Sequence, residues 1–194
     1  MLIRHGIEPL PIEHYKSLIG GGSEKLINAA IEAGLDFEER KMILAEYEAS
    51  YYDRCTVRTE HYSGIKELLD YLDNCAISYA VVSNKPQMIT EKIIKTFFPD
   101  RNWAGILGQR LNIPTKPNPA GVNEIISASG CQKSESLMIG DSYIDIETAQ
   151  RAGIKGIGAL WGYGSKEQLI NAGASLIIGS PQEICGFIQM KNRM

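Results

Sequence analysis

Three short polar segments in the second half of the chain carry side chains suited to handling phosphate. They are Val82-Ser83-Asn84, Thr115-Lys116-Pro117 and Gly140-Asp141-Ser142, the last followed by Asp145. Each segment follows an apolar, strand-like run. Together they provide a hydroxyl, an amide, an ammonium group and two carboxylates that suit a divalent cation. Phosphoryl transfer uses groups of this kind, because it depends on positioning the phosphoryl group and neutralising its charge.

Ser83 and Asn84 follow the predicted strand Ala76–Val82, where a hydroxyl and a free backbone amide are well placed to bind phosphate oxygens. The alternative is a simple turn, in which Ser83 or Asn84 caps a helix that begins near Pro86. The sequence leaves both interpretations open.

Lys116 lies in a loop that Pro114, Pro117 and Pro119 stiffen. Because proline fixes its own φ angle and restricts the residue before it, the ammonium group is held at a lower entropic cost than on a glycine loop. As a point charge, Lys116 can offset the charge of a phosphate or carboxylate. The alternative is a solvated loop lysine that precedes a helix.

Asp141 and Asp145 are four residues apart, a spacing that predicts two carboxylates on one face of a helix, near its positive end. Magnesium prefers oxygen ligands and keeps several waters, so one or two carboxylates are enough to hold it. The alternative is helix capping by Asp141 or Ser142, with Asp145 complementing the helix dipole.

Composition excludes some classes of partner. The net charge is −3, from 20 Lys and Arg against 23 Asp and Glu, and it provides no basic stripe for nucleic acid. No segment approaches the roughly 20 apolar residues of a membrane span, so we expect a cytoplasmic protein that does not bind membranes. The four cysteines have no paired spacing for zinc or redox chemistry and are interpreted as reduced thiols; they are Cys55, Cys75, Cys131 and Cys185.

The elements that must position these residues change character along the chain. From Pro11 to about Arg54, apolar residues recur at helical spacing, and Asp36 with Glu39 resembles a capping box. Ser23 is predicted to cap a helix, and Gly20-Gly21-Gly22 before it suits a turn or close approach to a ligand.

After about Cys55, strands alternate with helices, which predicts an α/β fold with a parallel sheet and functional loops at the carboxyl ends of the strands. The expected strands are 76–82, 103–107, 137–139, 155–160 and 174–178. The expected helices are 87–97, 119–129 with Asn118 as cap, 144–152, 166–171 and a closing helix.

Taken in order, Ser83-Asn84, Lys116-Pro117 and Gly140-Asp141-Ser142 with Asp145 resemble motifs two, three and four of the haloacid dehalogenase superfamily. The segment from Pro9 to Leu26 resembles the small helical cap of its phosphoglycolate phosphatase branch. The resemblance implies a Rossmann-like core at residues 61–194, a helical cap at residues 1–60 and Mg²⁺ as cofactor.

The resemblance also implies a role for each site residue. Ser83 and Asn84 would bind the phosphoryl group, and Lys116 would balance the phosphate and nucleophile charges. Asp141 would coordinate magnesium and Asp145 would support the metal site. The cap loop with Gly21 and Gly22 would close over a small phosphorylated metabolite.

The first motif of that family, Asp-x-Asp-Gly-Thr, has no match, because no Asp-x-Asp occurs in the 194 residues. The resemblance implies that the first core strand is absent and that the chain begins within the cap. Loss of an attacking carboxylate costs on the order of 10⁴ to 10⁶ in rate, so we expect impaired or absent phosphatase activity from this chain. The alternatives are an amino-terminally shortened form of a working phosphatase and a noncatalytic module that binds a phosphorylated metabolite or a partner. A generic flavin or nucleotide domain is disfavoured, because no strand is followed by a glycine fingerprint.

The absent strand has a structural consequence in the same resemblance, which places it between Ala76–Val82 and Leu137–Ile139. Removing one strand leaves a gap of about 10 Å with unpaired backbone groups on both sides. We expect the flanking strands to re-pair, or Met1-Leu2-Ile3 or a neighbouring chain to insert, the last giving a possible homo-oligomer.

Overall fold

The computed structural model describes residues 1–31 and 35–191. The helical region expected at 11–54 therefore includes residues 32–34, which lie outside the described part. The chain forms two compact units. The first contains Met1–Thr59, Ser83–Asp100 and Leu107–Thr115, and the second contains Glu60–Val82, Arg101–Ile106 and the chain from Lys116 onward. The division at residue 60 that the sequence suggested stays a prediction.

Helices alone occupy the chain up to Asn74, and from β1 onward strands alternate with helices as expected of an α/β protein. In the first part of the chain they are η1 (Leu2–His5), α1 (Ile12–Leu18), α2 (Ser23–Ala30), α3 (Phe37–Arg54), α4 (Ile65–Asn74), β1 (Ala80–Pro86), α5 (Gln87–Phe97) and β2 (Gly105–Gln109). In the remainder they are α6 (Ala120–Ser129), η2 (Lys133–Glu135), β3 (Leu137–Gly140), α7 (Tyr143–Ala152), β4 (Lys155–Ala159), α8 (Lys166–Asn171), β5 (Leu176–Ile178) and α9 (Gln182–Lys191).

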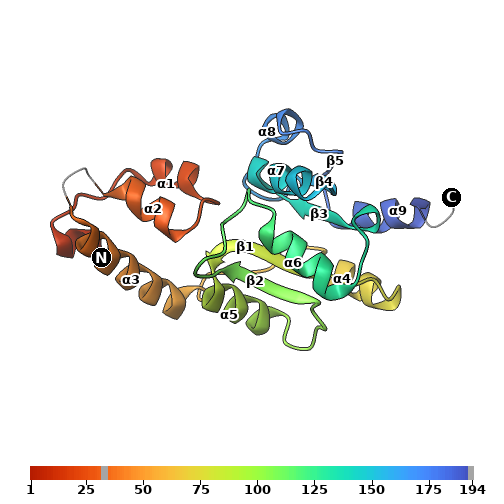
Figure 1. Cartoon of the computed structure of the whole chain (residues 1–194), viewed down its shortest axis with the longest axis horizontal. Helices are drawn as coiled ribbons and strands as arrows, with labels where there is room; N and C mark the ends of the chain where they lie inside the picture. Colours follow the sequence, from red (N-terminus) through yellow and green to blue (C-terminus); the bar gives the residue numbers. More distant parts are fainter. Residues whose placement is uncertain (32–34, 192–194) are drawn as a thin grey trace. The chain divides into compact units, whose positions relative to one another are not determined.

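The second unit holds a parallel sheet in the order β3-β4-β5, which confirms the predicted fold class (Figure 1). Leu137 aligns with Lys155 across the first pair, and Ile157 aligns with Leu176 across the second. Helix α7 packs on β3 and β4, and α8 packs on β4 and β5. Strand β4 is buried from Gly156 to Ala159, so it forms the centre of this sheet and fixes the carboxyl end of β3, where Asp141 follows.

Strands β1 and β2 pair with each other in a separate two-stranded sheet. Among the described residues β1 and β3 are not neighbours in a sheet, so the expected re-pairing of the flanking strands is wrong. The expected insertion of Met1-Leu2-Ile3 is also wrong. Leu2 and Ile3 lie in η1, while Met1 and Leu2 pack against the apolar cluster of the first unit. Insertion of a neighbouring chain, and with it a homo-oligomer, stays a prediction.

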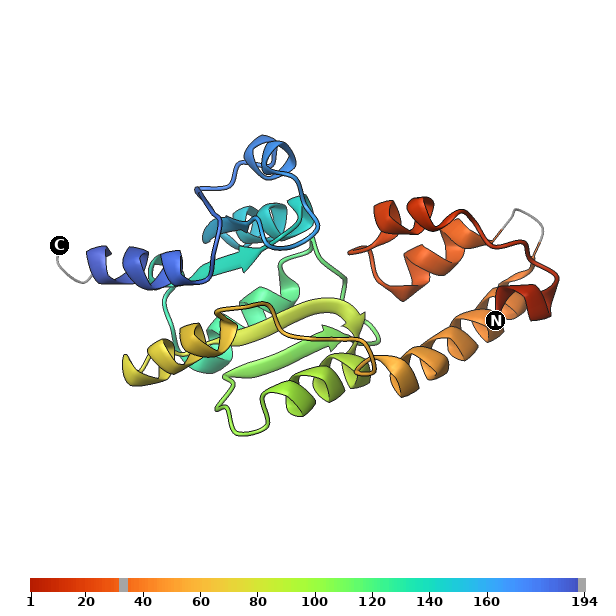
Figure 2. The ribbon, with the colours of Figure 1, turned by 180° about the vertical axis from the view of Figure 1, so that it is seen from behind.

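The first unit is built largely from helices, and its apolar cluster centres on Ile27, Ile31 and Ile43, with α2 packed on α3 (Figure 2). The capping box at the start of α3 is confirmed. Asp36 accepts from the Glu39 backbone N–H at 2.9 Å, and Glu39 accepts from the Asp36 N–H at 2.9 Å. The predicted cap at Ser23 is wrong, because Ser23 is already the first residue of α2 and Gly22 is the N-cap.

Three strands begin later than expected, and one of them is β5, which starts at Leu176 rather than at 174. Strand β1 begins at Ala80 rather than Ala76, because Ala76 has a φ of 53° and donates back to Asp73, which ends helix α4. Strand β2 occupies Gly105–Gln109 rather than 103–107. Within the described residues, the helices are too short or too polar to cross a bilayer.

Candidate active site

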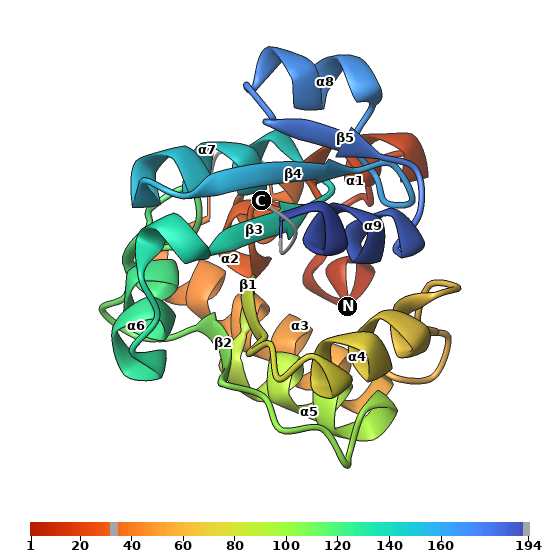
Figure 3. The same ribbon diagram turned by 90° about the vertical axis from the view of Figure 1, so that its right-hand side faces the viewer.

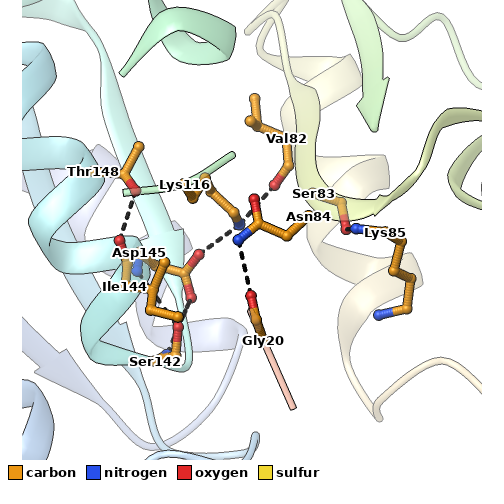
Figure 4. A network of polar contacts seen from close by, with 10 residues as sticks. All are labelled: Gly20, Val82, Ser83, Asn84, Lys85, Lys116, Ser142, Ile144, Asp145 and Thr148. Carbon is orange, nitrogen blue, oxygen red and sulfur yellow. Dashed lines mark hydrogen bonds and ion pairs between the residues drawn. The ribbon is translucent and has the colours of Figure 1, made fainter. Parts of the chain in front are cut away.

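Lys116 is held inside the second unit and is only 13% exposed (Figure 4). Its Nζ donates to the carbonyl oxygen of Val82 at 2.8 Å and to Asp145 Oδ1 at 2.7 Å. A lysine with two such partners and so little exposure is not a solvated loop residue, so that alternative is wrong. The proline-rich loop therefore holds the ammonium group in a fixed position beside the Val82 carbonyl.

Asp145 occupies the first turn of α7 and is 6% exposed. While Oδ1 accepts from Lys116, Oδ2 accepts from the backbone N–H of Ser142 at 3.1 Å and from its hydroxyl at 2.7 Å. Ser142 in turn accepts from the Asp145 N–H, which completes a capping box. The capping interpretation is therefore confirmed for Ser142. The same contacts fix Asp145, since a carboxylate near a helix N-terminus with a cationic partner has its charge well compensated.

Asp141 lies before α7 rather than on it, because the helix begins at Tyr143. The expectation that Asp141 and Asp145 share one helical face is therefore wrong. Asp141 instead faces the loop after β4, where its Oδ2 accepts from the Tyr163 N–H at 2.8 Å and its carbonyl accepts from the Gly164 N–H at 2.9 Å. A Cβ at position 162 would collide with the Asp141 side chain, so only glycine allows this approach.

The negative charge of Asp141 acts on a neighbouring phenol. The pKa of the Tyr62 hydroxyl is raised, first by burial and then by the neighbouring Tyr163 and Asp141. The carboxylate of Asp145, in contrast, forms an ion pair with Lys116.

A magnesium ion would find one suitable carboxylate here. Asp141 Oδ1 accepts no hydrogen bond from the described residues, whereas both oxygens of Asp145 are engaged by Lys116 and Ser142. The described part of the chain contains no group of three or more His, Cys, Asp or Glu side chains that could hold a metal alone. Magnesium commonly binds through one or two carboxylates, several waters and substrate phosphate, so these donors fit that ion.

Ser83 and Asn84 belong to the first unit and lie within β1, which continues to Pro86. Ser83 Oγ accepts from the Lys85 N–H at 3.1 Å. The N-cap of α5 is Pro86, with no side-chain cap, so the alternative that Ser83 or Asn84 caps this helix is wrong. The Asn84 side chain is buried and donates to the Gly20 carbonyl at 2.8 Å.

The glycine loop approaches this part of β1 within the first unit. Gly22 has a φ of 91°, and a Cβ there would lie 3.0 Å from the Asn84 carbonyl oxygen and 3.1 Å from Gln109 Oε1. At Gly21 a Cβ would meet the flexible side chain of Lys25. Gly22 therefore allows close packing against β1. Substrate contacts by Ser83, Asn84, Gly21 and Gly22 stay predictions.

Sequence reasoning missed the backbone partners of the two charged side chains. Neither the carbonyl of Val82 beside Lys116 nor the loop Gly162–Gly164 beside Asp141 has a sequence signature, because backbone atoms provide the contact. The Ser142-x-x-Asp145 pattern did carry a signal, since it matches a capping box.

Comparison with known proteins finds similarity to phosphatases over most of the chain. The family model for haloacid dehalogenase-like hydrolases matches residues 1–159. The chain is 28% identical over 186 residues to N-acetylmuramic acid 6-phosphate phosphatase of Pseudomonas aeruginosa, covering 95% of this chain and 82% of that protein. It is 27% identical over 182 residues to phosphoglycolate phosphatase of Pseudomonas fluorescens, covering 92% of this chain and 67% of that protein.

Solved structures show the same fold. A predicted phosphoglycolate phosphatase from Haemophilus somnus superposes with a TM-score of 0.85 at 24% identity, over 96% of this chain and 86% of that one. A predicted phosphatase from Clostridium acetobutylicum gives a TM-score of 0.83 at 22% identity, over 97% and 87%. With a family model that matches most of its length, the chain belongs to the haloacid dehalogenase-like hydrolases.

Proposed function

We propose that this hydrolase-family protein binds small phosphate monoesters of the phosphoglycolate class together with Mg²⁺. The observation that carries the proposal is the buried pair of Lys116 and Asp145, which holds an ammonium group in a fixed position. A lysine anchored in this way can bind a phosphate oxygen at a small entropic cost, because its side chain is already immobilised. Family membership and the phosphatase names of the relatives support the same class of ligand.

Each site residue has a proposed role. Lys116 counters phosphate charge, Asp145 orients Lys116, and Asp141 provides a carboxylate oxygen to the metal. Magnesium, when bound, neutralises charge on the phosphate oxygens. Ser83 and Asn84 are proposed as phosphate ligands on the strength of their sequence motif.

We further propose that the 194 residues by themselves turn the ester over slowly or not at all. They contain no Asp-x-Asp sequence. Without an attacking carboxylate, phosphoryl transfer cannot form the covalent intermediate that splits one high activation barrier into two lower ones. The second candidate function, a noncatalytic module that binds a phosphorylated metabolite, is favoured by the same observation.

Calorimetry and a phosphate-release assay on the same preparation test the proposal. We expect 2-phosphoglycolate to bind in the presence of Mg²⁺, glycolate not to bind, and little phosphate to be released. Lys116→Met should weaken phosphoglycolate binding at least tenfold, and Asp141→Asn should remove its dependence on Mg²⁺. Lys95→Met is the matched control, because that lysine is 67% exposed and its ion pair among the described residues is with Glu91 on its own helix.

The outcomes separate the two parts of the proposal. Absence of phosphoglycolate binding at millimolar concentration overturns the ligand class. Rapid phosphate release that Lys116→Met abolishes keeps the site but overturns the expected impairment. N-acetylmuramic acid 6-phosphate in the same assay tests the other substrate that a relative's name suggests.

A further inference from the structure

The loop between β4 and α8 lies against Asp141 and is anchored at both ends. Strand β4 lies between β3 and β5 (Figure 3), and just after it the Leu160 N–H donates to the Ile178 carbonyl of β5 at 3.0 Å. At the other end Ser165 is the N-cap of α8. Its Oγ accepts from the Gln168 N–H at 3.1 Å, and Gln168 Oε1 accepts from the Ser165 N–H at 3.0 Å. The short segment between these anchors is therefore held in place.

Two successive backbone N–H groups of this loop hold Asp141. The Tyr163 N–H donates to Asp141 Oδ2 at 2.8 Å, and the Gly164 N–H donates to the Asp141 carbonyl at 2.9 Å. A hydrogen bond from a backbone N–H to a carboxylate is charge-assisted and therefore stronger than one between neutral groups. The carboxylate thus has a fixed orientation, in which Oδ2 is engaged and Oδ1 accepts no hydrogen bond from the described residues.

Glycine at positions 162 and 164 makes this approach possible. A Cβ at Gly162 would overlap the Cβ, Cγ and Oδ2 atoms of Asp141, and a Cβ at Gly164 would overlap the Asp141 carbonyl oxygen. The overlap at Gly162 already begins at the Cβ of Asp141, so rotation of the carboxylate cannot relieve it. Gly186 on α9 belongs to the same unit, and a Cβ added there would meet nothing within 4 Å. Gly186 therefore provides a matched control.

We infer that loop 161–164 is a positioning element, which makes Asp141 a one-oxygen metal ligand and so selects Mg²⁺ over Ca²⁺. The inference rests on the proposed function, in which Asp141 provides an oxygen to the metal. Calcium takes about six to eight oxygens in flexible geometry and can bind both oxygens of one carboxylate, whereas magnesium demands a near-ideal octahedron and keeps several waters. Because the Tyr163 N–H holds Oδ2, only Oδ1 is available to an ion. This arrangement favours the smaller ion.

Displacement of Mn²⁺ from the full chain by Mg²⁺ or by Ca²⁺ tests the inference, with 2-phosphoglycolate present and electron paramagnetic resonance as the readout. We expect the wild-type chain to bind Mg²⁺ at least about tenfold more tightly than Ca²⁺. Gly162→Ala displaces the carboxylate, so it should weaken Mg²⁺ binding by about 10–100-fold, the usual cost of disturbing a group that orients a metal ligand. Ca²⁺ binding should change by less than about threefold, because calcium tolerates a displaced ligand.

Two control variants should leave both affinities unchanged. Gly186→Ala adds the same methyl group in open space. Tyr163→Ala removes an exposed side chain but keeps the backbone N–H that holds Asp141. A merely structural role of Gly162 would lower stability in urea unfolding without changing the ratio of the Mg²⁺ and Ca²⁺ affinities.

The outcomes separate this inference from the proposed function. A wild-type chain that does not bind Mn²⁺ overturns the metal part of the proposed function, and this inference with it. A wild-type chain that binds Mg²⁺ no better than Ca²⁺ overturns the inference alone, and this measurement needs no substitution, so it decides even if Gly162→Ala does not fold. A folded Gly162→Ala variant with an unchanged affinity ratio also overturns the inference alone.

Discussion

Replacing Lys116 with methionine is the sharpest test of the buried ion pair. The variant keeps most of the side-chain volume but removes the cation that faces Asp145 at 2.7 Å. The exposed fractions of the two side chains are 13% and 8%, so water screens the lost partner poorly. Removing one member of a buried pair costs about 3–5 kcal/mol. We expect about 3 kcal/mol, the lower end of this range, because both Ser142 hydrogen bonds to Asp145 remain.

Urea unfolding followed by tryptophan fluorescence measures this cost. Both tryptophans, Trp103 and Trp161, belong to the second unit, so the signal reports the unit that contains the pair. A loss of about 3 kcal/mol should lower the melting temperature by about 6–12 °C. Lys95→Met provides the control and should cost less than about 0.5 kcal/mol, because that surface pair is solvated.

A double-mutant cycle with Asp145→Asn decides whether the pair itself is responsible. The double variant should cost about 2 kcal/mol less than the sum of the two single variants. If Lys116→Met costs under about 1 kcal/mol, or if the two effects simply add, the reasoning about a coupled buried pair is refuted.

Two further predictions concern the first unit. Asp36→Ala removes one half of the capping box of α3 and should destabilise the unit by about 1 kcal/mol in urea unfolding followed by far-ultraviolet circular dichroism, with Glu38→Ala, which leaves the box intact, as control. The pKa of Glu46 is lowered from its ordinary 4.5, first by a hydrogen bond with His5 and then by Arg4. Its contribution to stability is therefore present above pH 4.5 and is lost as the pH falls through the lower folded-state pKa, so Glu46→Gln should flatten the acid limb of a melting-temperature profile. An acid limb unchanged by Glu46→Gln contradicts that assignment.

The fold was readable from the sequence where local signals and burial agreed. Helices α5 and α8 have their predicted bounds, and the apolar run Leu137–Ile139 marks β3, because a buried parallel strand needs a continuous apolar segment. The start of β1 was not readable. The apolar run from Ala76 to Val82 looks like one continuous strand, but Ala76 has a positive φ and lies in the turn that follows α4.

For the candidate site, the sequence predicted only which side chains take part. The types and spacing of Lys116, Asp141 and Asp145 predicted charged groups near strand ends. Their partners depend on tertiary contacts: Lys116 meets a backbone carbonyl, and Asp141 turns away from α7 toward a loop.

The turn that follows β4 shows why neighbouring positions in one loop can tolerate substitution so differently. At Gly162 any side chain would overlap Asp141, so replacement there is felt directly by that carboxylate. At Tyr163 the backbone N–H makes the contact while the side chain is 72% exposed. Variation among natural sequences should therefore be free at position 163 except for proline, which has no N–H to donate, and nearly forbidden one residue earlier.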